Sequence, residues 1–346
     1  MKKLLLKGSV FVMYLVVLEL VFPAVVDPFN VFHAEDVKPG GVYPNHNYIK
    51  MKYILKRPDR FNGCQFIFGS SRVGNINPDK ISAGNIYNMT YSEGLPAEHL
   101  ANIKTFLANS IIPSKIYLGV DSLSYTASMD VHIYEPMRCP YEYLCNDPLL
   151  FYSLYMNPAS TIHALGVMFS KKSSGKKQNS LYRVGTTINY GVKVSRNWEG
   201  LAPFIGHVPL SDIPQSIRNT LKDIHELSEL CRISGIELVI FTNPMHHITY
   251  RASLELGYFE FLEGLAEISD FWNFSSLSDI TMSNDLYLET SHFKAEVGDM
   301  IIEFMCKGRT DPELQAQGFG LKVTRENIKE FLGTLKKQAD TFTANS

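Results

Sequence analysis

Short apolar runs alternate with longer segments of helical periodicity over residues 61–306. The apolar runs predict strands at 65–68, 86–89, 115–120, 236–242 and 271–274. Apolar residues at helical spacing predict helices at 96–109, 211–234, 250–268 and 296–307. Strands of nearly continuous apolar character that alternate with helices are typical of a parallel sheet covered on both faces. We therefore predict an α/β fold with three layers, α/β/α, built on a parallel sheet.

Three segments lie outside this alternation. Residues 31–60 form a polar connector, and residues 307–346 form a charged tail with one amphipathic helix. Residues 126–205 interrupt the domain and are rich in Tyr, Ser, Asn, Lys and Gly, with an exposed loop predicted at 170–180. We interpret this interruption as an insertion that forms a cap or a partner surface.

The N-terminal segment, residues 1–30, is the most apolar part of the chain. Three early lysines precede an apolar stretch at 10–26, which is interrupted by a tyrosine, Glu19 and a proline. Its length approaches the roughly 20 residues that a membrane-spanning helix needs. Positive charge before such a helix favours a cytoplasmic N-terminus, with the rest of the chain outside. A cleaved signal peptide is the alternative, but 24–26 match a cleavage site poorly, so we favour an uncleaved anchor.

Glu19 lies within this apolar stretch, where a carboxylate is costly. One interpretation is a contact with a polytopic membrane partner. The other is a position close enough to the outer interface for the side chain to reach water, or a protonated side chain. The sequence leaves both open.

The composition narrows the class of protein. The 346 residues include 33 Lys and Arg against 35 Asp and Glu, a net charge of −2, so no basic excess points to nucleic acid. No Cys and His spacing resembles a zinc site, and no metal or cofactor is expected. Cys139 and Cys145 lie in a loop-like stretch and could pair as a disulfide outside the cytoplasm. Cys64, Cys231 and Cys306 lie in apolar patterns and are interpreted as core thiols.

Polar residues follow the predicted strands where each strand ends. In chain order these are Gly69, Ser70, Ser71, Arg72, Asn88, Gly94, Asp121 and His246, and Glu289 and His292 lie near the C-terminus in YLETSHFK. Because the carboxyl ends of parallel strands meet at one edge of a sheet, we expect these residues to form one site.

The residue types in this group suit acyl transfer or ester hydrolysis. A serine hydroxyl is a weak nucleophile and needs a base such as His292 within hydrogen-bond reach. Glu289 would hold the imidazole in the required tautomer, while main-chain N–H groups near Gly94, or the Asn88 amide, would stabilise an oxyanion. Each motif alone has an ordinary explanation: Gly-Ser-Ser suits a turn, and the Thr-Ser pair before His292 could cap the next helix. Their shared order and edge favour a site.

These motifs resemble the SGNH hydrolase superfamily, whose fold is flavodoxin-like. In that family a Gly-Asp-Ser turn carries the nucleophile and an Asp-x-x-His pair completes the triad. Aligning the turn with GSSR makes Ser71 the nucleophile, although a shift of one residue would select Ser70. The triad carboxylate here is Glu289, where the family has Asp. The family's Gly-x-Asn-Asp block, whose amide donates to the oxyanion, reads Gly-Val-Asp at 119–121, and an ionised Asp121 cannot donate.

The whole layout resembles membrane-anchored bacterial envelope proteins of the teichoic-acid D-alanyl-transfer and alginate O-acetylation type. This resemblance implies a single-pass protein of the inner (cytoplasmic) membrane with its main domain in the periplasm or outside the cell. It implies an acyltransferase that uses a Ser-His-Glu triad to modify a hydroxyl of an envelope polysaccharide or exopolysaccharide. It also implies a polytopic partner of the membrane-bound O-acyltransferase type. A carbohydrate esterase with the same triad, or a catalytically decayed polysaccharide-binding or secretion scaffold, are the alternatives.

Three of the candidates have competing roles. Arg72 could bind an anionic substrate or pair with Asp121, and we favour the ion pair. Asp121 is as well suited to fixing the neighbouring turns as to chemistry. His246 is interpreted as a loop or capping residue that could also bind substrate near the cleft.

Overall fold

The computed structural model describes residues 2–33, 44–169, 194–195, 197–198 and 200–344 of the 346-residue chain. The chain divides into two compact units, which are treated separately below. The helical unit comprises Met1–Arg57 with Met129–Tyr182, and the sheet unit comprises Pro58–Ser128 with Arg183–Ser346. The loop predicted at 170–180 lies outside the described residues.

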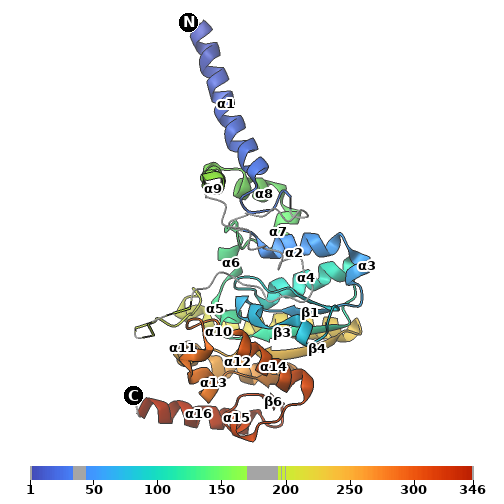
Figure 1. Cartoon of the computed structure of the whole chain (residues 1–346), viewed down its shortest axis with the longest axis vertical. Helices are drawn as coiled ribbons and strands as arrows, with labels where there is room; N and C mark the ends of the chain where they lie inside the picture. The colour runs from blue at the N-terminus through green and yellow to red at the C-terminus, as the bar shows by residue number, and fades with distance from the viewer. Residues whose placement is uncertain (1, 34–43, 170–193, 196, 199, 345–346) are drawn as a thin grey trace. The chain divides into compact units, whose positions relative to one another are not determined.

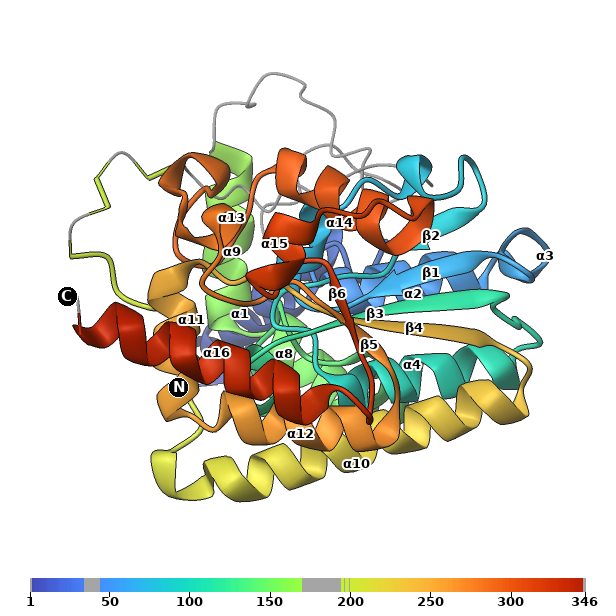
Figure 2. The same ribbon diagram turned by 90° about the horizontal axis from the view of Figure 1, so that it is seen from below.

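The sheet unit contains a six-stranded, mostly parallel sheet in a mixed α/β fold. Its strands are β1 (Gln65–Phe68), β2 (Ile86–Asn88), β3 (Lys115–Val120), β4 (Glu237–Thr242), β5 (Phe271–Asn273) and β6 (Leu321–Val323). Their order is β2-β1-β3-β4-β5-β6, and the first five are parallel (Figure 2). The prediction of a parallel sheet is wrong for one strand: β6 pairs with β5 in the antiparallel direction.

Alternate side chains of β1 point to opposite faces of the sheet and enter different parts of the core. Phe66 and Phe68 pack on Phe106 of helix α4 (Pro96–Ala108), with ring centroids 5.1 and 6.3 Å apart. Ile67 instead belongs to a buried cluster that includes Val297 of helix α14 (Ala295–Lys307). This alternation explains the continuous apolar run, since both faces of the strand are buried.

Helix α10 (Ile213–Ile233) confirms the long amphipathic helix and ends before Gly235, whose φ is +69°. The single helix predicted at 250–268 is two helices, α11 (His247–Glu255) and α12 (Tyr258–Ile268). Gly257 separates them with φ +78°, a left-handed conformation that glycine adopts without steric cost. The remaining short elements of the unit up to residue 286 are α3 (Pro58–Phe61), η1 (Ser71–Asn75), η2 (Pro78–Lys80), α5 (Leu123–Thr126), η4 (Leu210–Asp212), α13 (Asp279–Met282) and η5 (Asn284–Leu286).

The C-terminal segment is part of the sheet unit rather than a separate tail. It contains α15 (Pro312–Ala316), β6 and α16 (Ile328–Ala344), drawn in red tones in Figure 1. Phe319, Phe331 and Leu335 are buried, and β6 extends the sheet. A domain boundary at residue 306 therefore does not hold, because the segment after it contributes both a strand and core side chains.

The helical unit joins the N-terminus to part of the predicted insertion. Its helices are α1 (Lys2–Val26), α2 (His46–Leu55), α6 (Met129–His132), α7 (Tyr141–Asn146), α8 (Pro148–Tyr155) and α9 (Pro158–Phe169). The predicted connector at 31–60 and insertion at 126–205 are therefore not independent segments. Residues up to 57 group with 129–182, while the chain from 183 onward belongs to the sheet unit.

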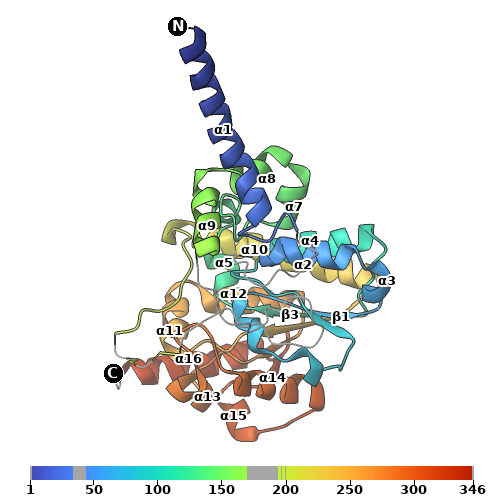
Figure 3. The ribbon, with the colours of Figure 1, turned by 45° about the horizontal axis from the view of Figure 1, so that its top comes forward.

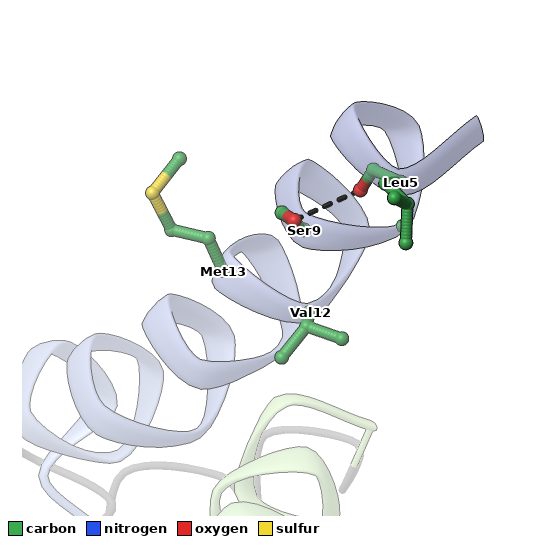
Figure 4. A pocket seen from close by; sticks show the side chains of 5 residues that line it. Leu5, Ser9, Val12 and Met13 are labelled. Carbon is green, nitrogen blue, oxygen red and sulfur yellow. Dashed lines mark hydrogen bonds between the residues drawn. The ribbon is translucent and has the colours of Figure 1, made fainter. Parts of the chain in front are cut away.

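Helix α1 is, among the described residues, the one helix long and apolar enough to cross a membrane, as a signal sequence also would be. That span is Leu5–Val26, and little of it is buried. Figure 4 shows Leu5, Val12 and Met13 projecting from the helix near its start. The Ser9 hydroxyl donates a hydrogen bond to the Leu5 carbonyl at 2.8 Å (Figure 4), so this polar group has a partner within the helix itself.

The five cysteines are free thiols in this structure. Cys139 is buried and Cys145 is exposed. Because both are free thiols, the structure does not contain the disulfide that their spacing allowed. Cys64 and Cys231 are buried, as predicted, but Cys306 is exposed near the end of α14, where an apolar pattern still leaves one face of the helix outside the core.

Candidate active site

The turn after β1 presses closely on the neighbouring strand. Gly69 has φ +152°, and a Cβ placed on it would lie 2.5 Å from Val73 Cγ2 and 2.9 Å from the Gly119 carbonyl oxygen. A residue with a side chain could not occupy this position without displacing the turn. The sequence GSSR therefore follows the strand because glycine allows the chain to turn sharply there, leaving Ser71 as the first residue of η1.

This turn lies at the point where the strand order reverses. β1 is flanked by β2 on one side and β3 on the other, and all three are parallel. Ser71 follows β1 and Asp121 follows β3, so both lie beyond the carboxyl ends of adjacent strands. In open parallel sheets, ligands bind in the crevice at such a reversal point.

The structure brings together the three residues predicted to act as a triad. Ser71 Oγ lies 2.8 Å from His292 Nε2, and His292 Nδ1 lies 2.5 Å from Glu289 Oε1. A tight loop holds the last two residues, because the Leu288 N–H donates to the His292 carbonyl at 2.8 Å. With Nδ1 protonated toward the carboxylate, Nε2 can accept the Ser71 proton, which is the arrangement of an activated serine.

The environment of Glu289 keeps its carboxylate ionised. Oε1 accepts the main-chain N–H of His292 and Oε2 accepts that of Ser291, both at 2.8 Å. Burial by itself raises the pKa of Glu289, but the hydrogen bond and charge of His292 and the two main-chain donors outweigh it and lower the pKa. The SGNH pattern has an aspartate at this position. A glutamate can bind His292 Nδ1 here because its longer side chain folds back onto its own loop.

Arg72 is fully buried and connects three parts of the site. Its Nη1 forms an ion pair with Asp121 Oδ1 at 2.7 Å, which confirms the predicted pairing. Its Nε donates to Ser291 Oγ at 3.0 Å, and its Nη2 donates to the Phe204 carbonyl at 3.3 Å. Arg72 therefore links the turn after β1, which carries Ser71, to the loop that carries His292. Ser291 does not cap the next helix: Lys294 occupies that position and makes no side-chain cap.

Asp121 is occupied by structural contacts on both oxygens. Oδ1 also accepts the Leu123 N–H at 2.7 Å, and Oδ2 accepts Asn243 Nδ2 at 2.7 Å. Asn243 follows β4 and holds the carboxylate from the next strand along the sheet. The position where the SGNH pattern has an amide donor is thus used to fix two neighbouring turns.

The remaining candidates near the turn differ in what they can offer. Ser70 is buried and its hydroxyl accepts the Arg72 N–H at 3.4 Å, so it caps η1. Asn88 is also buried: its Oδ1 accepts the Thr90 N–H at 3.0 Å, and its Nδ2 lies 3.4 Å from the Val73 carbonyl. These hydrogen bonds join both side chains to main-chain groups of this region.

Gly94 packs against the turn after β1 that carries Ser71. A Cβ placed on it would be 2.6 Å from the Gly69 carbonyl oxygen and 2.8 Å from the His99 ring. Its own N–H donates to the Tyr91 carbonyl at 3.3 Å, which is a long bond for a turn. Gly94 is therefore packed against Gly69 of this turn, while its N–H is bonded to Tyr91.

His246 is buried, and its ring contacts and hydrogen bonds are with residues outside the triad. Its ring stacks on Trp198 with centroids 4.8 Å apart, its Nε2 pairs with Asn284 Oδ1 at 2.9 Å, and its Nδ1 accepts the Ile248 N–H at 3.4 Å. Burial lowers the pKa of His246, with the Asn284 hydrogen bond opposing that shift. Its observed role is to cap α11, which agrees with the simpler of its two interpretations.

A short segment at 202–206, which the sequence did not single out, runs along the site. Thr290 Oγ1 donates to the Ala202 carbonyl at 2.9 Å, and the Phe204 N–H donates to Thr249 Oγ1 at 3.0 Å. The Phe204 ring lies 5.9 Å from the Arg72 guanidinium carbon. These partners sit in an irregular loop far from the motifs along the chain, so no local pattern could have identified them.

Within the described residues, no cluster of His, Cys, Asp or Glu is arranged to hold a metal ion. A scan against models of known protein families finds no match, and a search among curated proteins finds no similar sequence. The interpretation of the site therefore depends on its geometry and on the resemblance of its motifs.

Proposed function

We propose that the chain is a membrane-anchored, extracytoplasmic serine enzyme of the SGNH type that transfers an acyl group to a hydroxyl of an envelope polysaccharide or exopolysaccharide. The observation that carries this proposal is the chain of contacts from Ser71 through His292 to Glu289. The order of the first five strands, which matches that of flavodoxin-like sheets, supports the three-layer SGNH arrangement. Helix α1 would be the anchor.

In the proposed reaction Ser71 Oγ attacks the acyl carbonyl carbon while its proton passes to His292 Nε2. Glu289 keeps Nδ1 protonated and stabilises the imidazolium that forms. His292 returns the proton to the leaving group, and an acyl-serine remains. A polysaccharide hydroxyl, deprotonated by His292, then attacks this ester and regenerates Ser71. The same residues therefore act in both halves of the reaction.

The state of Asp121 bears on the kind of acyl donor. Its carboxylate is held by Arg72, Leu123 and Asn243, so it offers no amide to an oxyanion. A site with fewer donors is better suited to an activated acyl donor than to a simple ester. Such a donor would be delivered by the polytopic acyltransferase partner that the resemblance implies.

Covalent labelling tests the proposal directly. The full chain in detergent is treated with a fluorophosphonate, which reacts with an activated serine and releases fluoride, and the adduct is mapped by mass spectrometry. We expect the adduct on Ser71, its loss in Ser71→Ala and His292→Ala, and its retention in Ser70→Ala. Ser70→Ala is the matched control because Ser70 is the adjacent serine of the same turn. An unlabelled wild-type chain that is shown to be folded would contradict an activated serine.

A second measurement separates the two enzymatic outcomes. A small acyl ester is supplied with and without an oligosaccharide acceptor, and the products are analysed by mass spectrometry. Transfer predicts acylated oligosaccharide that is absent in Ser71→Ala. Release of free acid alone, with no acylated acceptor, would favour the esterase.

A further inference from the structure

Helix α9 has a buried side and an exposed side, and the exposed side is apolar. Ser160 and Ala164 form the buried side, four residues apart, and α9 packs against α1. The other side carries Ile162, which is 69% exposed, and Phe169, which is 79% exposed. These two are seven positions apart, so they share one face of the helix. A water-facing helix normally shows a polar outer face, and α9 does not.

Helix α8, the element before α9, also exposes a large apolar side chain. Its sequence, PLLFYSLY, contains no charged residue, and Leu149 is 83% exposed while Leu154 and Tyr155 are buried. Three of the large apolar side chains in the unit thus point outward from two consecutive helices. Singly exposed apolar residues are normal in soluble proteins, but several on two consecutive helices are more typical of a contact surface.

The position of this surface relative to α1 identifies what would cover it. Just after α1 ends, Asp27 accepts the N–H groups of Val31 and His33, each at 2.8 Å, and fixes a tight turn. Phe29 in that turn packs on Tyr155 and His163, with centroids 5.5 Å apart in both pairs. Figure 3 shows α8 and α9 beside the C-terminal end of α1. If α1 crosses a membrane, these helices lie where the chain emerges from it.

We propose that α8 and α9 form a second membrane contact, with Leu149, Ile162 and Phe169 inserted into the interfacial layer of the bilayer. This inference rests on the proposed role of α1 as an anchor. Interfacial helices bury their apolar side chains about 5 to 10 Å into the boundary between headgroups and acyl chains.

Quenching by brominated lipids tests this contact in the full chain. Phe169→Trp and Ile162→Trp place reporters on the exposed face, and Leu210→Trp places a matched reporter on a residue of the sheet unit that is 75% exposed. Each variant is reconstituted into vesicles of phosphatidylcholine and phosphatidylglycerol, with and without bromine on the acyl chains. The wild-type signal from the two native tryptophans is subtracted.

We expect bromine to remove most of the added emission of Phe169→Trp and Ile162→Trp and to leave that of Leu210→Trp unchanged. Absence of quenching at both α9 positions would overturn the proposal and leave the membrane segments of a partner protein as the occupant. Equal quenching at Leu210→Trp would also overturn it, because it would indicate general adsorption. Labelling of Ser71 and alkaline extraction of the same vesicles report the enzyme and the α1 anchor separately, so failure of either is distinguishable from failure of this contact.

Discussion

Substitution of Glu289 by glutamine tests whether the carboxylate activates the serine through the histidine. Glu289 accepts three donors on two oxygens: the main-chain N–H of Ser291 on Oε2, and both the main-chain N–H and Nδ1 of His292 on Oε1. A glutamine has nearly the same shape but presents one acceptor oxygen and one NH₂ donor. In either orientation of the amide, at least one N–H donor faces another donor.

The two orientations impair the site in different ways. With the amide oxygen toward Ser291, the NH₂ faces Nδ1 of His292, which then favours the tautomer protonated on Nε2, and that nitrogen cannot accept the Ser71 proton. With the oxygen toward His292 the tautomer is kept, but the negative charge that stabilises the imidazolium is gone. General-base contributions are about 10²- to 10⁴-fold, so we expect labelling to slow by that factor, about 2.7 to 5.4 kcal/mol in the barrier.

The assay is the second-order rate of fluorophosphonate labelling of the full chain near neutral pH. Glu296→Gln is the matched control, because Glu296 is exposed in the first turn of α14. This substitution removes the same charge but leaves the environment of His292 unchanged. We expect Glu296→Gln to react at the wild-type rate. If Glu289→Gln also reacted at that rate, the carboxylate would not act through the histidine, and the triad interpretation would be refuted.

Three further perturbations test the surroundings of the triad. Asp121→Asn should lower the unfolding free energy by about 3 to 5 kcal/mol, because Arg72 is left as a buried charge without its counter-ion. Denaturant unfolding followed by tryptophan fluorescence measures this change. An unchanged unfolding midpoint would contradict the prediction. Because the pKa of Glu289 is lowered on folding, its stabilising contribution is complete above about pH 4.3 and is lost as the pH falls through the lowered value. The difference in unfolding free energy between wild type and Glu289→Gln should therefore shrink in acid, whereas a constant difference would count against the shift. Gly69→Ala should destabilise by about 1 to 3 kcal/mol and abolish labelling, because a Cβ has no room there. Gly63→Ala, also at a positive φ (+77° against +152°) but with open space around its Cβ, should retain labelling.

The sheet and the Arg72–Asp121 pair could be predicted because their signals are local. A strand buried on both faces appears as an unbroken apolar run, as at Gln65–Phe68, and parallel strands bring their carboxyl ends to one edge. Arg72 and Asp121 each follow such a strand directly, so a short rule about strand ends was enough to place them together. His292 does not directly follow a strand, so its contact with Ser71 was expected from the motif near the C-terminus rather than from this rule, and its catalytic role stays a prediction.

Other features depend on contacts that leave no local pattern. β6 is three residues long with an exposed lysine at its centre, Lys322, so no period of two can be detected; its pairing depends on the free edge of β5. The break between α11 and α12 depends on one glycine, Gly257, within a segment whose apolar spacing is otherwise continuous. The sequence indicated only that Ser291 could cap a helix. Its hydrogen bond to Arg72 could not be predicted, because the two residues lie far apart in the chain.

The buried ion pair constrains how this site could stabilise an oxyanion. An unpaired Asp121 beyond β3 would repel the developing negative charge, but Arg72 neutralises it at 2.7 Å without exposing a donor of its own. Under the proposed function, oxyanion stabilisation would fall to main-chain N–H groups of the turn that begins at Ser71. Losing one side-chain donor typically costs about 10²- to 10³-fold in rate. An acyl donor with a good leaving group tolerates that loss better than a simple ester, because less charge stabilisation is needed to reach its transition state. Under the proposed function, the chemistry best matched to these residues is acceptance of an activated acyl group, which the proposed acyltransferase partner would supply.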